Sequence, residues 1–245
     1  MRNIEEYAKD YVNDYDFENY QVKYRRRKIL EIIEQYAPES LLEIGCGLSP
    51  IGEFCNGLKM YTVVEPSKYF CEIACQKFSN NAVRGMGYEV INDFFSSSLC
   101  MNKNYDMIIC SSLLHEVENP KNLLHEILLA SNQNTIIHIN VPNADSFHRI
   151  LAVKSGLIET TKTFSGRNIQ MQQHTVFDMN SLINIMSETG FDVIEQGQYF
   201  LKPFSHSQMA KMIEFNIIDE KILDGLYEMG KENFGSEIYV NARRK

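Results

Sequence analysis

The segment from residue 41 to residue 50, LLEIGCGLSP, constrains the fold of this 245-residue chain more than any other. It reads as a buried strand that runs into a glycine turn, with one acid, Glu43, inside the strand. Eighteen residues after Gly47, a second acid, Glu65, closes another apolar run, YTVVE. A glycine turn after one strand and an acid after the next are typical of open α/β sheets that bind a nucleoside. The sequence therefore predicts such a sheet and such a site.

Pro50 indicates which kind of nucleoside the turn suits. It stands where the dinucleotide fingerprint G-x-G-x-x-G has its third glycine. Proline supplies neither the close packing nor the N–H that a pyrophosphate needs there, but it fits the first turn of a helix, which we expect over 50–56. Glu43 adds a carboxylate that would repel a pyrophosphate and suit a cation. The turn thus favours S-adenosylmethionine (SAM), a cationic nucleoside, over NAD.

Apolar runs alternate with amphipathic segments along the chain, a pattern typical of a mostly parallel sheet with right-handed crossovers. We expect strands over 40–44, 60–65, 88–92, 106–110, 135–141, 191–200 and 237–242, helices over 25–36, 119–130 and 178–190, a helix capped by Ser67, and two helical segments within 205–230. Residues 1–24 predict a weak helical segment, and 153–175 an irregular stretch. Ligands of such sheets bind at the carboxyl ends of the strands, so the residues that follow each strand are the candidates for a site.

Residues 43–47, EIGCG, resemble motif I (E/D-x-G-x-G) of the class I SAM-dependent methyltransferases. The runs 105–117 (YDMIICSSLLHEV) and 136–143 (IIHINVPN) resemble that family's fourth and fifth strands, so the resemblance covers nearly the whole chain. It implies an α/β fold with a Rossmann-like, seven-stranded, mostly parallel sheet, helices on both faces and an antiparallel last strand. It also implies a single methyltransferase domain over 1–245, with an N-terminal helical cap (1–39) and a lid or substrate insertion (144–177).

The resemblance implies SAM as the cofactor and S-adenosylhomocysteine (SAH) as the product. Glu65 would accept the ribose hydroxyls, and Glu43 would lie near the methionine ammonium, directly or through water. Asp93 would meet the adenine amino group, although a helix N-cap beside a core aromatic is the alternative for Asp93 and Phe94. The cofactor-binding residues expected on this basis are Glu43, Gly45, Gly47, Glu65, Pro66, Asp93, Phe94 and Ser111.

His115 is the candidate catalytic residue, because it follows the fourth expected strand, beside the methyl donor. Transfer to a hydroxyl requires that a proton be removed, and histidine titrates near the working pH. The alternative is a partly solvated histidine on a helical turn. Many relatives have Glu followed by His at these two positions, whereas this chain has His115 followed by Glu116.

The candidates for binding the methyl acceptor are spread over the chain. The run 141–149, VPNADSFHR, resembles methyltransferases of bacterial sugar and surface-glycan pathways, and Arg149 would clamp an anionic acceptor. In this family the N-terminal segment often folds over the cofactor, where a tyrosine could contact the sulfonium. The substrate residues expected are Tyr20, Tyr24, Asn143, His148, Arg149 and His174, with Lys202 as a further candidate. For each of them the alternative is an ordinary surface, cap or loop residue.

Composition excludes several classes of partner. A formal net charge of −8 argues against nonspecific binding to nucleic acid or to an anionic membrane surface. There is no apolar run of ~18 residues, no signal-like apolar core near the N-terminus, and no C-x-x-C pair or Asp/Asn/His cluster for a metal. We therefore expect a cytoplasmic protein with free thiols and no metal, a monomer or homodimer that acts on a small molecule, without nucleic acid or stable membrane insertion.

These expectations combine into a leading hypothesis and two alternatives. The leading hypothesis is transfer of a methyl group from SAM to an oxygen or nitrogen of a small molecule. On resemblance, the acceptor is a sugar, nucleotide-linked compound or phospho-compound, phosphoramidates included, that is a precursor of bacterial surface polysaccharide. The alternatives are an O-methyltransferase of quinone or lipid type, and a catalytically silent SAM-binding regulatory protein.

Overall fold

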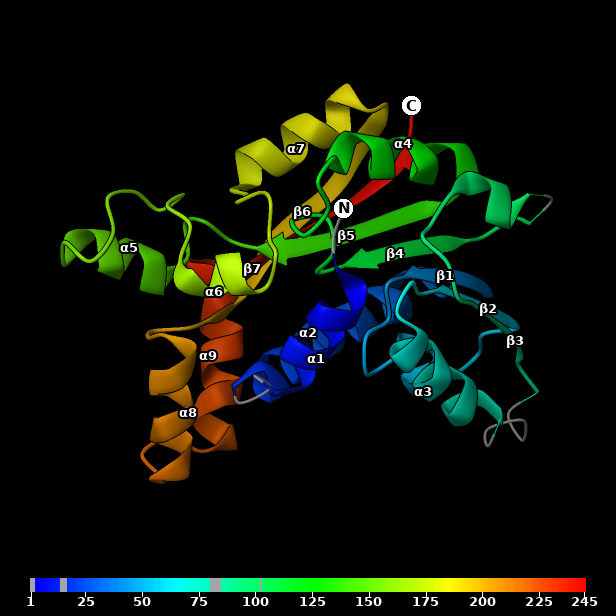
Figure 1. Ribbon diagram of the computed structural model, residues 1–245. Coiled ribbons are helices and arrows are strands. Elements are labelled where there is room, and N and C mark those ends of the chain that lie inside the picture. Colours follow the sequence, from blue (N-terminus) through cyan, green and yellow to red (C-terminus); the bar gives the residue numbers. More distant parts are fainter. Residues whose placement is uncertain (1–2, 14–16, 80–84, 102) are drawn as a thin grey trace.

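A seven-stranded sheet forms the centre of the computed structural model, which describes residues 3–13, 17–79, 85–101 and 103–245. The strands are β1 (Ser40–Ile44), β2 (Met60–Val64), β3 (Gly87–Ile91), β4 (Met107–Ser111), β5 (Ile136–Pro142), β6 (Phe191–Leu201) and β7 (Gly235–Arg244). Their order is β3-β2-β1-β4-β5-β7-β6. The first five strands pair in parallel, and β7 lies antiparallel between β5 and β6 (Figure 1). The predicted Rossmann-like sheet with an antiparallel last strand is confirmed.

Helices cover both faces of the sheet (Figure 1). One face carries α4 (Pro120–Ala130) and α7 (Met179–Glu188), and the other carries α2 (Glu18–Tyr36), α3 (Lys68–Ser79) and α9 (Glu220–Glu232). Along β1, Leu42 and Ile44 pack in the core under α4 and α7, whereas Leu41 packs in the core under α2. This alternation explains why the central strands read as continuous apolar runs: both of their faces are buried.

The N-terminal helices are longer than periodicity indicates. α1 spans Ile4–Asn13, and α2 begins at Glu18 rather than at the expected residue 25. Phe17 is fully buried at the start of α2, and the helix buries Gln21 and Arg25 as well. Polar side chains on a buried helical face do not produce an amphipathic pattern, so the sequence predicts a helix that is shorter than α2. Within the predicted cap, residues 1–2 and 14–16 lie outside the described ones.

Two further segments differ from expectation. The expected helix over 50–56 is only η1, a single 3-10 turn (Ile51–Phe54), because Pro50 is extended with ψ of 132°. The stretch 153–175 is less irregular than predicted. It begins with the end of α5 (Phe147–Lys154), and it contains α6 (Gly166–Gln170), whose start is fixed by a reciprocal capping box between Ser165 and Asn168.

The remaining elements agree with the sequence. Asp178 caps α7, and the segment after β6 forms α8 (His206–Glu214) and α9. Among the described residues, no helix is long and apolar enough to cross a membrane.

Candidate functional site

A cavity of about 880 Å³ opens at the carboxyl edge of the sheet, between the loops after β1, β2, β4 and β5 and the N-terminal helices. The predicted site residues that line it are Gly45, Gly47, Glu65, Pro66, Phe94, Ser111, His115, Asn143, His148, Arg149 and Lys202. Within the described part of the chain, five predicted site residues do not line it: Tyr20, Tyr24, Glu43, Asp93 and His174. The structure thus gathers most of the predicted site into one place.

The glycine turn and Glu65 form the floor of the cavity. Gly45 and Gly47 both have positive φ, at 76° and 53°, a conformation that glycine adopts without strain. Glu65 Oε2 accepts the N–H groups of Cys46 (3.0 Å) and Gly47 (3.2 Å), and Oε1 accepts that of Ser67 (2.9 Å). These three backbone donors fix the carboxylate at the turn. A Cβ at Gly47 would meet nothing within 4 Å, so the backbone there is open to a ligand.

Glu43 lies behind this turn rather than beside the cavity, which corrects its predicted contact with a methionine ammonium. Its carboxyl group accepts the N–H of Ile51 (2.9 Å), the first donor after Pro50, and the hydroxyl of Tyr61. Burial raises the pKa of Glu43 to about 7, against the opposing effect of these two hydrogen bonds. Because Pro50 has no N–H, Glu43 holds the start of η1, and its role in this structure is to support the turn.

Asp93 also differs from expectation. It is exposed, and its Oδ1 accepts the N–H of Phe94 at 2.7 Å. Phe94 does line the cavity, although 52% of its surface is exposed, so it is not the core aromatic of the alternative reading. Contact between Asp93 and an adenine stays a prediction. Nearby, Asn92 Nδ2 donates to the carbonyl oxygens of Glu65 (2.9 Å) and Pro66 (3.1 Å), which fixes the loop after β2.

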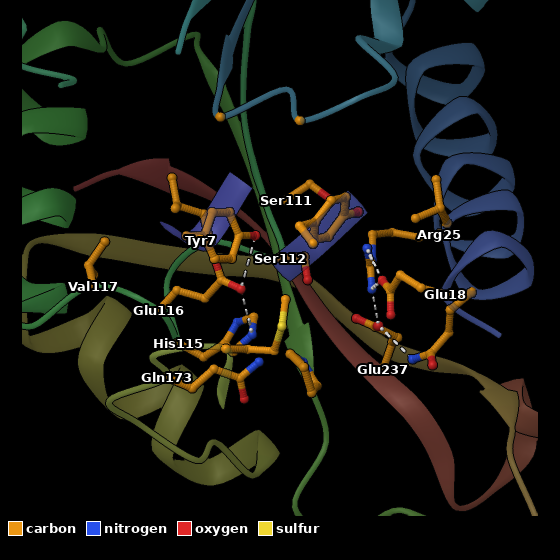
Figure 2. A pocket seen from close by; sticks show the side chains of 18 of the residues that line it. Tyr7, Glu18, Arg25, Ser111, Ser112, His115, Glu116, Val117, Gln173 and Glu237 are labelled. Carbon is orange, nitrogen blue, oxygen red and sulfur yellow. Dashed lines mark hydrogen bonds and ion pairs between the residues drawn. The ribbon is translucent and has the colours of Figure 1, made fainter. Parts of the chain in front are cut away.

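His115 is buried in the loop after β4, on the left of the cavity in Figure 2. Its Nε2 lies 3.8 Å from Glu116 Oε1, which also accepts the hydroxyl of Tyr7 from α1 at 3.5 Å. The His115 carbonyl accepts the N–H groups of His174 (2.9 Å) and Thr175 (3.1 Å). The His174 side chain is exposed, so this residue acts through its backbone and does not bring an imidazole to the cavity.

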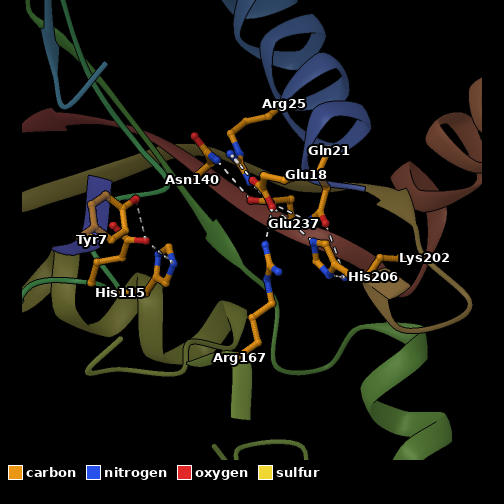
Figure 3. Close-up of polar contacts among 11 residues, drawn as sticks. Tyr7, Glu18, Gln21, Arg25, His115, Asn140, Arg167, Lys202, His206 and Glu237 are labelled. Atoms are coloured by element: carbon orange, nitrogen blue, oxygen red, sulfur yellow. Dashed lines mark hydrogen bonds and ion pairs between the residues drawn. The ribbon is translucent and has the colours of Figure 1, made fainter. Parts of the chain in front are cut away.

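The opposite side of the cavity contains a buried ion-pair network that the sequence did not reveal. Arg25 from α2 lies between Glu237 of β7 (2.7 Å) and Glu18 (3.4 Å), as Figures 2 and 3 show. Gln21 (3.2 Å) and Asn140 (3.3 Å) complete the donors to Glu237. Burial opposes ionisation of Glu18, but its hydrogen bond to His206 and the charge of Arg25 hold its pKa well below the usual range. The network ties α2 to β7.

Arginine, lysine and histidine side chains extend this network along the cavity (Figure 3). Arg167 and His206 Nε2 lie 3.4 Å and 3.3 Å from Glu18. Lys202, of which 4% is exposed, has its Nζ 3.0 Å from His206 Nδ1 and 3.5 Å from Gln21 Oε1. Burial lowers the pKa of Lys202 to about 7, with the charge of Arg167 acting in the same direction against that of Glu18. Burial and Lys202 lower the pKa of His206 to about 4.

The residues predicted after β5 line the cavity, and two of them, Arg149 and Asn143, are already engaged. Arg149 Nε donates to the carbonyl of Thr161 at 2.6 Å, and its Nη2 donates to that of Thr163, so this guanidinium holds the following loop. Asn143 Nδ2 donates to Gly235 O at 2.9 Å, which ties the loop after β5 to the start of β7. Burial and the neighbouring cations lower the pKa of His148 far below its usual value.

The two predicted tyrosines lie away from the cavity. Tyr24 is fully buried; its ring stacks 4.7 Å from Phe200, and its hydroxyl donates to Asp224 at 2.9 Å. Tyr20 packs against the same core and stacks on Phe17. Tyr7 and Tyr11 of α1 line the cavity instead. The spacing of Glu18, Gln21 and Arg25, three and four residues apart, is the one sequence signal that could have indicated a polar face on α2.

The cavity therefore has two sides of opposite charge. We call the carboxylates after β2, after β4 and on α4 the acidic side: Glu65, Glu116, Glu118 and Glu126. We call the groups from α5, α6 and the β6–α8 connection the basic side: His148, Arg149, Arg167, Lys202 and His206. In Figure 2, Ser111 and Ser112 lie between Glu116 and the ion-pair network of Arg25.

Comparison with known proteins identifies the family. A family model described as a methyltransferase domain matches residues 18–196. A search of curated proteins finds no match. Among solved structures, the chain is similar to a SAM-dependent methyltransferase of Thermotoga maritima described as a possible histamine N-methyltransferase, with a TM-score of 0.61, 17% identity and 100% of both chains covered.

Two other solved structures share the fold. The N-methyltransferase NodS of Bradyrhizobium japonicum, in complex with SAH, has a TM-score of 0.54 and 13% identity, with 90% of this chain and 85% of NodS covered. The cyclase SpnF has a TM-score of 0.56 and 13% identity, with 89% of this chain and 80% of SpnF covered. At such identities the likeness establishes the fold and not the reaction.

Proposed function

Because the chain belongs to the methyltransferase-domain family, we propose that it transfers the methyl group of SAM to an oxygen or nitrogen of a small molecule. The observation that carries this proposal is the position of Glu65, fixed by three backbone N–H groups at an open glycine turn that forms the floor of the cavity. A carboxylate held in this way is an acceptor suited to a pair of vicinal hydroxyls, such as those of a ribose.

The acidic side fits the charge of the cofactor. SAM supplies an electrophilic methyl group on a positively charged sulfur, and the protein binds, orients and shields it. Glu65 would accept the ribose hydroxyls, the backbone at Gly45 and Gly47 would allow close approach of the methionine part, and Phe94 would cover the adenine. A cavity side lined by several carboxylates favours a ligand of net positive charge.

His115 is placed to assist the transfer. It is buried on the acidic side of the cavity that Ser111 also lines, with its Nε2 3.8 Å from Glu116 Oε1. In this position the imidazole would remove the proton of an acceptor hydroxyl or bind an acceptor amine. Most of the rate enhancement would come from alignment of acceptor and methyl group in a site without bulk water. The segment 144–177, which includes α5 and α6, would act as the lid.

The acceptor class is the least constrained part of the proposal. The resemblance of residues 141–149 supports a sugar, nucleotide-linked compound or phospho-compound, phosphoramidates included, used for surface polysaccharide. The six cysteines are free thiols, which suits the reducing cytoplasm in which such precursors would be methylated by a monomer or homodimer. A quinone or lipid acceptor is less consistent with a cavity that contains buried arginine, lysine and glutamate.

Glu65→Ala tests the cofactor assignment. Loss of charge-assisted hydrogen bonds to two hydroxyls should weaken SAM and SAH binding at least about 100-fold in calorimetric titration. Glu72→Ala, which removes an exposed carboxylate on α3, is the matched control and should bind as the wild type does. Glu65→Gln keeps the shape of the side chain and should show an intermediate loss. Unchanged SAH affinity in a folded Glu65→Ala protein would refute the assignment.

Release of SAH separates transfer from silent binding. The purified protein would be incubated with SAM and panels of sugar phosphates, sugar nucleotides and amines. Formation of SAH that depends on one of these compounds supports a transferase. SAM binding without any acceptor-dependent SAH would favour the regulatory alternative.

A further inference from the structure

The basic side of the cavity carries more positive than negative charge. Its two acidic neighbours are already neutralised, since Arg25 lies between Glu18 and Glu237 and Arg167 adds a second contact to Glu18. Lys202 and Arg149 have no carboxylate within 4 Å among the residues that the structure describes. Two cationic side chains thus face one cavity without a counter-charge.

Such an arrangement is costly unless something compensates it. A buried ammonium without an anionic partner is destabilised, and only 4% of the Lys202 surface is exposed. Arg149 donates its hydrogen bonds to the carbonyl groups of Thr161 and Thr163. Because a carbonyl group carries no net charge, the positive charge of Arg149 stays uncompensated. His148 adds a buried Nδ1 that has no hydrogen-bond partner within the described ranges. The basic side therefore has donors and charge to offer that the protein itself does not use.

We propose that the basic side binds an oxyanion carried by the methyl acceptor, with Lys202 and His148 as donors and Arg149 and Arg167 as its electrostatic surroundings. The inference rests on the proposed function, since it assigns the acceptor to the side opposite the cofactor. Two uncompensated cations match a doubly charged group such as a phosphate monoester. The carboxylate of SAM is the other available oxyanion, but the methionine part belongs at Gly45, on the β1 side.

Binding of the oxyanion is coupled to a proton. The groups that face Lys202 are Glu18 and Arg25 on α2, His148 and Arg149 on α5, Arg167 on α6, His206 on α8 and Glu237 on β7. Because the pKa of Lys202 is about 7, a substantial fraction is neutral at pH 7, and a bound dianion favours the ammonium form. The oxyanion should therefore bind with uptake of a proton near pH 7, and more weakly as the pH rises through this value.

Inorganic sulfate is the probe, because it stays doubly charged over the whole pH range of interest. The SAH complex would be titrated with sodium sulfate, with sodium chloride at matched ionic strength as reference, and the dissociation constant taken from the rise in Tm. A pH electrode in unbuffered solution would record proton uptake. The wild type should bind sulfate and take up a fraction of one proton per sulfate at pH 7.

Lys202→Met should weaken sulfate binding roughly 10- to 100-fold and remove the proton uptake, while SAH affinity stays within about threefold of the wild type. Lys211→Met, which changes an exposed lysine on α8, is the matched control and should leave both unchanged. If Lys202→Met does not fold, His148→Asn should still weaken sulfate without loss of SAH binding. Sulfate binding that Lys202→Met leaves intact overturns the inference.

The outcomes separate this inference from the proposed function. Failure of the wild type to bind SAH refutes the proposed function itself. Normal SAH binding with no effect of sulfate beyond chloride refutes the oxyanion subsite alone. A tenfold or greater loss of SAH affinity in Lys202→Met would mean that the basic side holds the cofactor carboxylate, which also overturns the inference.

Discussion

The acidic and basic sides of the cavity are built in different ways. The acidic side comes from loops at the carboxyl ends of neighbouring strands, and Glu65 is held there by backbone N–H groups. The basic side brings together α5, α6, the β6–α8 connection and the start of α8, next to the Arg25 network that joins α2 to β7. Other side chains hold Arg167 and Lys202, and backbone carbonyls hold Arg149. A backbone-held carboxylate survives changes in packing, whereas a network of side chains depends on every member.

The contrast matches a division of labour between the two ligands. The nucleoside cofactor needs a fixed turn with one acceptor, which local sequence supplies. The acceptor site can vary by changes on helices and insertions that leave the sheet intact. The comparison predicts that substitutions on the basic side act on stability and acceptor binding, and those on the acidic side on the cofactor and the reaction.

The largest expected effect is on stability, through Arg25→Met. Removal of the cation leaves Glu18 and Glu237 buried side by side, which should lower the free energy of unfolding by about 3–5 kcal/mol. Urea unfolding followed by circular dichroism measures this. Lys23→Met is a control on the same helix as Arg25. It removes an exposed ion pair with Glu220 of α9 and should lower the free energy of unfolding by less than about 1 kcal/mol. Equal costs for the two variants would show that the network does not hold α2 to the sheet.

Glu43 gives the next largest effect, as a pH dependence. Its pKa rises from an ordinary value of 4.5 to about 7 in the folded protein, so between these values the unfolded chain loses a proton that the folded protein keeps. Stability should therefore fall by on the order of 3 kcal/mol as the pH rises through this window. Glu43→Gln removes the titrating group and should flatten this part of the unfolding profile. An unchanged slope would place the ionisation elsewhere.

His115→Ala should act on turnover and not on the cofactor. Loss of a proton acceptor should lower kcat roughly 100-fold with any compound that supports SAH release in the wild type. SAH affinity should stay within about threefold, since the backbone of the loop is retained. His125→Ala, at an exposed position on α4, is the control. Full turnover in His115→Ala would exclude this residue as the base and direct attention to His148.

The same contrast explains what the sequence could predict. The sheet and the glycine turn follow from contiguous patterns, and Gly45, Gly47, Glu65 and Ser111, which these patterns indicate, line the cavity. Glu43 belongs to the same motif, yet its direction depends on Tyr61 and Ile51, which the motif does not include. A contiguous pattern gives the position of a residue, and only the fold gives its partners.

The ion-pair network of Glu18, Arg25 and Glu237 could not be predicted because its members lie far apart in the sequence, from residue 18 to residue 237. Glu18 and Glu237 look like ordinary surface acids until α2 and β7 pack together. Tyr24 illustrates the reverse case: it was a candidate because the N-terminal segment of this family often folds over the cofactor, but its ring stacks on Phe200 in the core. Contacts between residues so far apart carry no signature in one sequence.

The most direct test of two separate binding sides is a crossed titration of Glu65→Ala and Lys202→Met, each with SAH and with sulfate. The account predicts a crossover: Glu65→Ala loses SAH affinity at least about 100-fold and keeps sulfate binding, whereas Lys202→Met keeps SAH and loses sulfate at least about tenfold. Parallel losses of both ligands in both variants would contradict it, because the two sides would then form a single site.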